Sequence, residues 1–327
     1  MSAPLAAAIV AAGLAGLAVW LLLRARARLP HAAVSSRGLH GAPVPRVGGL
    51  AIWAGFVPVA LWAAPPPLMA PALWGVPWLL LAGVSLRDDV RSVPVGPRLF
   101  VHLLAAAAFA FVLARAAPVA WPLAALAGLV CVWSLNLYNF MDGSDGLAAS
   151  MSIAGFAAYA AVLAWNGLPF AVPLALAAAT VPVLAVNRPR ARMFLGDVGA
   201  VPLGFLAAAW GIGGIAAGAW PAWFPVLVFL PFIADATATL ARRVLRRERF
   251  WEAHRSHYYQ RLHRLGAGHA GTLAAWGALM AGTCVTAVVC ATVLPGFGEA
   301  ALLAWCAVHA AVFAGIDYHW RRNAPAE

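Results

Sequence analysis

Residues Leu5 to Leu23 read LAAAIVAAGLAGLAVWLLL, a run of apolar residues without a single charge. A helix rises about 1.5 Å per residue, so about 20 apolar residues cross the hydrocarbon core of a bilayer. No basic residue precedes this run, and its length suits a span better than a cleaved secretory signal. The stretch therefore predicts a first transmembrane helix.

Similar apolar runs, each about 17 to 22 residues long, follow along the whole chain, which is 64% hydrophobic and 10% charged. They centre near residues 55, 78, 107, 127, 156, 178, 208, 230, 282 and 307. Abundant Ala and Gly let helix backbones approach closely where lipid gives no hydrophobic force between helices. We expect an all-α, polytopic membrane bundle of about 11 helices, forming one domain over residues 1–327.

The basic residues are all arginines, and their positions predict the topology. If eleven spans alternate, every Arg except Arg115 falls in segments on one side: 24–46, 87–98, 188–192, 242–264 and 321–322. Cytoplasmic segments carry such an excess. The N-terminus is then periplasmic and the C-terminus cytoplasmic. Nucleic-acid binding is not expected, because it would need these arginines on a soluble face.

The predicted cytoplasmic segment Asn136-Leu-Tyr-Asn139-Phe-Met-Asp142-Gly-Ser-Asp145-Gly146 gathers amides and carboxylates in a chain with few acids. Their hard oxygen donors suit Mg²⁺ or Mn²⁺. The spacing is too short for a calcium loop and lacks its distal Glu. The alternative is a polar turn that uses Asp-Gly chemistry.

Three further cytoplasmic segments hold candidate residues. Asp88 and Asp89 are adjacent carboxylates that repel unless a cation offsets them, although solvated helix-end charge is the alternative. Asp197 lies where a helix begins, a place that suits a phosphate site or a simple cap. Arg46 could reach phosphate or only mark the inner side.

The longest predicted cytoplasmic loop, about 242–269, contains His254, Arg255 and His257 beside two tyrosines. Such residues suit a polyanionic ligand that carries a base. The alternative is an amphipathic segment on anionic lipid headgroups. Zinc is not expected, because no Cys or second His pair accompanies the two histidines.

Taken in order, these motifs resemble those of the polyprenyl-phosphate N-acetylhexosamine-1-phosphate transferases. The family's Pro-x-Pro-Arg-x-Gly-Gly stands at 43–49, its Asp-Asp pair at 88–89, its Asn-x-x-Asn-x-x-Asp-Gly-x-Asp-Gly at 136–146, and its Phe-x-Gly-Asp-x-Gly at 194–199. The resemblance implies an active site in the cytoplasmic segments 24–47, 86–98, 136–146, 187–199 and 241–270. It also implies that undecaprenyl phosphate attacks a UDP-N-acetylhexosamine, giving undecaprenyl-diphospho-sugar and UMP.

The resemblance also implies residue roles. Asp197 and Asn139 would bind Mg²⁺, with Mn²⁺ as the alternative. The catalytic set would be Asp88, Asp89, Asp142 and His257, and the substrate-binding set Asp145, Asn187, Phe194, Arg46, His254 and Arg255. Asp145, Asn187 and Phe194 match positions at the uridine end of the donor, with Phe194 as a stacking surface. Asp88 is either an orienting group or a base.

The late loop departs from the family pattern, because only His257 and the pair Arg261-Leu262 match a dense His motif. This departure favours the branch that initiates O-antigen or capsule synthesis, often on N-acetylated 6-deoxyhexosamines, over the peptidoglycan enzyme. It leaves the sugar open. The expected place is the bacterial inner membrane, among membrane lipids, with the site facing the cytoplasm. Whether the protein forms a homodimer is open.

The main rival is a transporter or flippase for a lipid-linked or anionic solute, and a second is a scaffold that has lost catalysis. Transporters usually place charged groups near the bilayer midplane in broken helices. Here the apolar runs are almost free of ionisable residues, and the acids gather at one face. The sequence therefore favours an enzyme with its site at the membrane surface.

Overall fold

The structure is a computed structural model that describes residues 2–26, 29, 44–66, 68–249 and 254–323. Regular structure in these residues is helical, apart from an isolated parallel bridge between Arg46 and Phe194. The helices are α1 (Ala3–Arg24), α2 (Gly48–Trp62), α3 (Pro71–Val90), α4 (Val95–Ala116), α5 (Trp121–Met141), α6 (Leu147–Trp165), α7 (Ala171–Asn187), α8 (Asp197–Ala216), α9 (Trp223–Val228), α10 (Leu230–Leu245), α11 (Tyr258–Leu262), α12 (Gly268–Thr292) and α13 (Gly298–Asn323).

Each predicted apolar run corresponds to a helix, so the all-α polytopic prediction is confirmed. Among the described residues, 7 helical segments are long and apolar enough to cross a membrane, and α2 and α7 are shorter apolar helices. The run centred near residue 230 is broken at Phe229 into α9 and α10. Pro231 explains the break, because its ring clashes with the carbonyl four residues earlier.

The predicted loop 242–269 is largely helical, which corrects the expectation of a long irregular segment. α10 continues to Leu245, α11 begins at Tyr258, and a π-helical segment, His263–Ala267, leads directly into α12. Residues 250–253, inside this predicted loop, and 27–28 and 30–43, which include Pro43 of the entry motif, lie outside the described residues.

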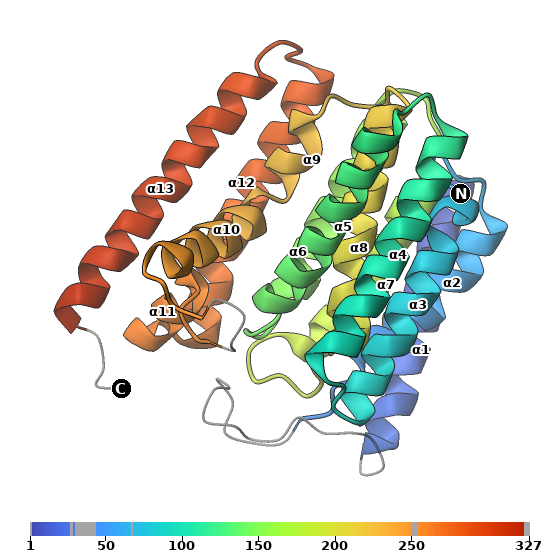
Figure 1. The fold of residues 1–327 in the computed structure, drawn as a ribbon. Helices are drawn as coiled ribbons and strands as arrows, with labels where there is room; N and C mark the ends of the chain where they lie inside the picture. The colour runs from blue at the N-terminus through green and yellow to red at the C-terminus, as the bar shows by residue number, and fades with distance from the viewer. Residues whose placement is uncertain (1, 27–28, 30–43, 67, 250–253, 324–327) are drawn as a thin grey trace.

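Helix α8 lies at the centre of the bundle, where it packs against α2, α3 and α5. Small residues allow the close contacts: a Cβ on Gly204 would lie 2.6 Å from the Ser134 carbonyl oxygen on α5. On the other side, α12 packs on α6 and α9, with α13 outermost (Figure 1). Burial of α8 therefore fixes the place of its first residue, Asp197.

The motif-bearing segments gather at one end of the bundle. Figure 1 shows the turns after α3, α5 and α7 at the same end as α11 and the C-terminus, while the N-terminus lies at the other end. Segments far apart in the sequence thus meet because the helices alternate in direction. The side of the membrane that this end faces stays a prediction.

Candidate active site

A polar pocket of about 130 Å³ lies where the ends of α3, α4, α5 and α8 meet. It brings together three predicted site residues, Asp88, Asn139 and Asp197. The remaining lining residues are Val84, Ser85, Val95, Arg98, Leu99, His102, Asn136, Phe140 and Val201. The three motifs that these residues represent therefore lie close together in the structure, as the sequence predicted.

Asp88, in the last turn of α3, is held by two donors. The Val93 backbone N–H donates to Oδ1 at 2.6 Å, and Arg98 Nη1 donates to Oδ2 at 2.6 Å. Arg98 Nη1 also lies 3.7 Å from Oδ2 of Asp197. One guanidinium therefore faces both carboxylates.

This role of Arg98 could not be predicted from the sequence, because Arg98 is one of many arginines on the predicted cytoplasmic side. His102, one turn further along α4, was missed for a similar reason. It lies inside an apolar run, where a single His has no motif around it, and the structure buries it in the pocket wall.

Asp89 caps α8 from the neighbouring helix. Its buried carboxylate accepts hydrogen bonds from the backbone N–H groups of Asp197 at 3.1 Å and Val198 at 2.8 Å, and Arg46 Nε lies 3.5 Å away. The first N–H groups of a helix need such acceptors. The sequence allowed Asp197 to be the cap of α8, but Asp89 has that role. The Asp197 side chain lines the polar pocket instead.

The entry motif is fixed to the segment before α8 by backbone pairing. The Phe194 N–H donates to the Pro45 carbonyl at 2.8 Å, and Arg46 Nη2 lies 3.1 Å from Asp197 Oδ1. A Cβ on Gly49 would lie 2.4 Å from the backbone of Gly199. The lack of a side chain at Gly49 therefore permits this close contact with α8.

Asp145 and Asn187, expected at the uridine end of the donor, bind backbone in this structure. Asp145 Oδ2 accepts from the N–H groups of Arg190 at 3.1 Å and Ala191 at 3.2 Å. Asn187 Oδ1 accepts from Gly146 N–H at 3.0 Å, and its amide donates to the Met193 carbonyl at 3.0 Å. Both side chains therefore tie the 142–146 turn to the 188–195 segment, while the Phe194 ring is partly exposed beside them.

Asp142 follows the last residue of α5 and is partly buried. Burial first, and then the carboxylates of Asp197, Asp89 and Asp145, raise its pKa well above the usual range, against the lowering effect of Arg46. Like charges crowded in this way favour a bound cation. The cluster thus sets the carboxyl groups of Asp88, Asp89, Asp142 and Asp197 against the two guanidiniums of Arg46 and Arg98.

His257 is held by a buried acid that the sequence analysis missed. Asp235, fully buried on α10, lies 3.3 Å from His257 Nδ1 and accepts from the N–H groups of Tyr258 and Tyr259, each at 2.9 Å. The His257 ring lies 5.8 Å from that of Phe140, which lines the polar pocket. The apolar runs are expected to be almost free of ionisable residues, and Asp235 is an exception. An acid inside a membrane needs a partner. A single Asp in an apolar run of the sequence could therefore have drawn attention to Asp235.

The other two predicted residues of this segment lie close to His257. The His254 ring stacks on that of His257 with centroids 5.0 Å apart, and its Nδ1 lies 2.9 Å from the Ser256 hydroxyl. Burial first, then His257 and Arg243, lowers the pKa of His254 to about 4, so it is neutral at pH 7. Arg255 is partly buried and has no ion pair with the described residues.

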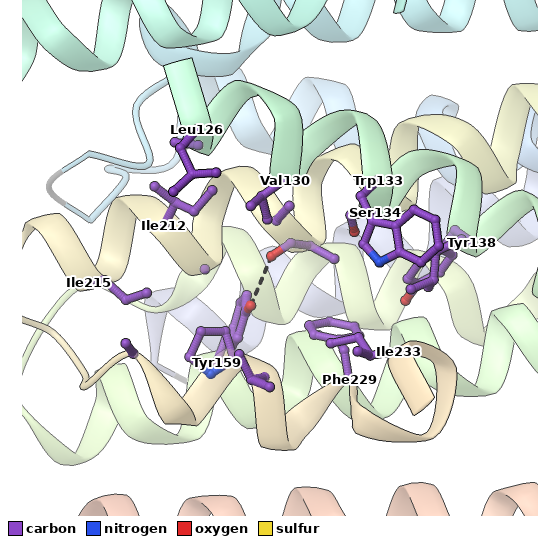
Figure 2. A pocket seen from close by; sticks show the side chains of 18 of the residues that line it. Leu126, Val130, Trp133, Ser134, Tyr138, Tyr159, Ile212, Ile215, Phe229 and Ile233 are labelled. Atoms are coloured by element: carbon purple, nitrogen blue, oxygen red, sulfur yellow. Dashed lines mark hydrogen bonds between the residues drawn. The ribbon is translucent and has the colours of Figure 1, made fainter. Parts of the chain in front are cut away.

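An apolar cavity of about 520 Å³ opens between α5, α6, α8 and the α9–α10 break. Figure 2 shows Leu126 and Ile215 toward one end and Tyr138 and Ile233 toward the other, with the Tyr159 hydroxyl bonded to the Ala207 carbonyl in its wall. Tyr138 precedes Asn139 of the polar pocket. The apolar cavity and the acidic pocket share no lining residue, but α5 and α8 contribute residues to both.

The donor set fits a hard divalent cation. No group of three or more His, Cys, Asp or Glu side chains in the described part of the chain could hold a metal ion by itself. The pocket instead offers the carboxylates of Asp88 and Asp197 with the Asn139 carboxamide, which has no hydrogen-bond partner among the described residues. Mg²⁺ is usually bound in this way, by one or two carboxylates completed by substrate phosphates and water.

Comparisons with known proteins agree with this geometry. Residues 72–215 match glycosyl transferase family 4. The chain is 26% identical over 251 residues to a probable undecaprenyl-phosphate N-acetylglucosaminyl 1-phosphate transferase of Bacillus subtilis, covering 72% of this chain and 70% of that protein. It is 28% identical over 211 residues to a decaprenyl-phosphate N-acetylglucosaminephosphotransferase of Mycobacterium tuberculosis, covering 53% and 50%.

A third relative is a phospho-N-acetylmuramoyl-pentapeptide-transferase of Thermotoga neapolitana, 32% identical over 120 residues, or 37% of this chain and 38% of that protein. The family match runs from α3 to α8 and so includes the whole polar pocket. The resemblance drawn from the motifs is confirmed: over residues 72–215 the chain is similar to glycosyl transferase family 4, and its relatives include polyprenyl-phosphate N-acetylglucosamine-1-phosphate transferases.

Proposed function

We propose that this bacterial membrane protein transfers an N-acetylhexosamine-1-phosphate from a UDP-sugar to undecaprenyl phosphate. A phosphate oxygen of the lipid attacks the β-phosphorus of the donor. The bond from that phosphorus to the bridging oxygen breaks, and UMP leaves. The products are undecaprenyl-diphospho-sugar and UMP, formed at the cytoplasmic face of the inner membrane.

One observation carries this proposal: the same two helices, α5 and α8, line both a pocket of acids and an amide and an apolar cavity inside the membrane bundle. The reaction joins a water-soluble anionic donor to a lipid acceptor, so it needs both environments within reach of each other. The cavity is apolar enough to shield isoprenoid units, whose burial is favourable by about 25 cal/mol per Å².

Asp197 and Asn139 would hold Mg²⁺, with Mn²⁺ as the alternative. The ion, when bound, would offset the negative charge that develops on the diphosphate as UMP departs. Arg46, which already pairs with Asp197 at 3.1 Å, and Arg255 would add positive charge near the phosphates. Electrostatic stabilisation and positioning thus supply most of the catalysis in this proposal.

Asp88 serves in this proposal as an orienting group. Its carboxylate is held by Val93 and Arg98, and a phosphate monoester with a second pKa near ~6 is already mostly dianionic at neutral pH. A general base is therefore not required for the acceptor. The Asp142 carboxylate would add negative charge near the ion. His257 would contact the transferring phosphates.

The residues at the uridine end take two kinds of role. Asp145 and Asn187 would shape the donor pocket through the backbone that they bind, while the Phe194 ring would stack on the base. Asp89 acts as a positioning residue, because it fixes the first turn of α8 and hence Asp197. His254, neutral at pH 7, would offer a stacking or hydrogen-bonding surface.

We also propose that the product initiates an O-antigen or another cell-surface polysaccharide. The support is the late segment, which keeps His257 and Arg261 but lacks a dense run of histidines. Asp235, a buried acid in an apolar run, does not support a transporter. Its oxygens are bound to the protein's own backbone and side chains, so it offers no path for a solute.

The proposal can be tested by measuring UMP release from the purified full chain, supplied with undecaprenyl phosphate, Mg²⁺ and a panel of UDP-N-acetylhexosamines that includes 6-deoxy sugars. UMP release that needs both lipid and sugar nucleotide supports the proposal, and the donor that works names the sugar. No UMP from any donor, for protein that retains its helical circular dichroism, counts against a transferase.

A further inference from the structure

A small basic pocket lies apart from the polar pocket, between α10, α11 and the end of α13. Its volume is about 100 Å³, roughly three times the ~30 Å³ share of one water molecule. It is lined by Arg242, Arg246, Arg261, Asp317, Trp320 and Arg321. Figure 1 shows these helices converging at the end of the bundle where α11 lies.

The pocket holds four guanidiniums and one carboxylate. Asp317 accepts from Arg242 at 3.0 and 2.7 Å, from Arg261 Nη1 at 2.8 Å, and from the Tyr258 hydroxyl at 3.2 Å. Its two oxygens are therefore fully used. Arg246, by contrast, is exposed and has no ion pair within the described part of the chain.

Two further observations show guanidinium donors that no described residue uses. Arg321, at the end of α13, is also exposed and has no ion pair with a described residue. The Nε of Arg261 is buried and has no hydrogen-bond partner in the described structure. The cluster therefore lacks an anion, and an oxyanion with several acceptor oxygens suits guanidinium donors best.

The surroundings of the pocket are those of a membrane boundary. Tyr318 on α13 is 55% exposed and Leu245 on α10 is 85% exposed, so apolar and aromatic side chains flank the arginines. Trp320 lies under Arg264, whose guanidinium carbon is 4.8 Å from its ring centroid. Aromatic rings and arginines together mark the level of lipid headgroups.

We propose that this pocket binds the phosphate group of an anionic membrane lipid, with a phosphodiester between Arg246, Arg321 and the pair formed by Arg242 and Arg261. The pocket is large enough for a phosphate group and too small for a nucleotide. The site stands independently of the proposed transferase activity. It lies next to the His257 segment, because Tyr258 contacts Asp317 through its hydroxyl and Asp235 through its N–H.

The test measures lipid binding to the purified full chain by native mass spectrometry, with phosphatidylglycerol and phosphatidylcholine as probes. The pocket variant is Arg246→Gln with Arg321→Gln, two exposed residues whose loss should not unfold the protein. The control is Arg87→Gln with Arg91→Gln, which removes the same charge from exposed positions at the end of α3. We expect phosphatidylglycerol to bind the pocket variant roughly 30-fold more weakly, and the control like the wild type.

Equal weakening in the pocket variant and the control would overturn the site, because it would show only diffuse attraction. Unchanged binding in the pocket variant would overturn it as well. A separate arm adds inorganic phosphate and follows thermal unfolding. The lipid assignment would be overturned if phosphate stabilises the wild type but not the pocket variant, and phosphatidylglycerol shows no selective binding. The ligand would then be a soluble phosphate.

Discussion

Asp235→Asn tests whether the buried acid positions the His257 segment for reaction. The carboxylate receives the Tyr258 N–H on Oδ1 and the Tyr259 N–H on Oδ2, each at 2.9 Å. Asparagine is nearly the same size but has one acceptor oxygen. If that oxygen stays toward Tyr258 and His257, the new amide faces the Tyr259 N–H, which then loses its acceptor.

The expected cost follows from that single lost contact. A hydrogen bond to a charged group contributes about 1.5–3 kcal/mol, and about 1.4 kcal/mol corresponds to a tenfold change in an equilibrium or a rate. The ordered state of the segment should therefore become about 10- to 150-fold less populated relative to its opened forms. Because His257 is proposed to contact the transferring phosphates, kcat should fall by up to that factor, and KM for the donor should change much less.

Two measurements check this prediction, amide hydrogen exchange at Tyr258 and Tyr259, and steady-state UMP release. The matched control is Thr239→Val, which removes the 3.2 Å hydrogen bond from the Thr239 hydroxyl to Asp235 without touching the segment. The control should keep both exchange protection and kcat close to wild type. Wild-type exchange and wild-type kcat in Asp235→Asn would refute the positioning role.

Further predictions concern the cap, the helix contact and the pH response. Asp89→Asn should leave one N–H of the α8 first turn without an acceptor, and thermal unfolding should show a loss of about 1–3 kcal/mol; an unchanged midpoint would contradict the cap. Gly49→Ala should cost about 1–3 kcal/mol through overpacking, whereas Gly75→Ala, where a Cβ meets nothing within 4 Å, should not destabilise. Equal midpoints for the two variants would contradict the tight contact. Burial lowers the pKa of His254 to about 4 in the folded protein, from an ordinary value of 6.5. Its contribution to stability is therefore complete above pH 6.5 and is lost as the pH falls toward 4. His254→Gln should flatten that part of a stability profile measured by thermal unfolding, and an identical slope would contradict it.

The sequence predicted the membrane fold well because span length is fixed by bilayer thickness. The ordered motifs also predicted that Asp88, Asn139 and Asp197 meet, since alternating helices return each motif to the same end. Finer geometry did not follow from the sequence. Nothing in the Asp88-Asp89 pair shows that Asp89 turns toward the α8 N-terminus while Asp88 lines the pocket.

Residues that act from within apolar runs were harder to predict. Asp235 follows an apolar run as a single acid, and its partners lie 22 to 24 positions away in sequence. Asp317 was missed for the same reason, because its partner Arg242 lies 75 positions away. A rule that every acid in an apolar run needs a partner would have flagged both, without naming which partner.

We propose that Asp197 anchors a metal-dependent phosphoryl transfer at this pocket. The most direct measurement is UMP release from UDP-N-acetylhexosamines by the purified wild type and Asp197→Ala, with undecaprenyl phosphate, in the presence and absence of Mg²⁺. We predict UMP from the wild type only with lipid and Mg²⁺, and none from Asp197→Ala at wild-type helical content. Mg²⁺-dependent UMP release by folded Asp197→Ala at the wild-type rate would contradict the claim.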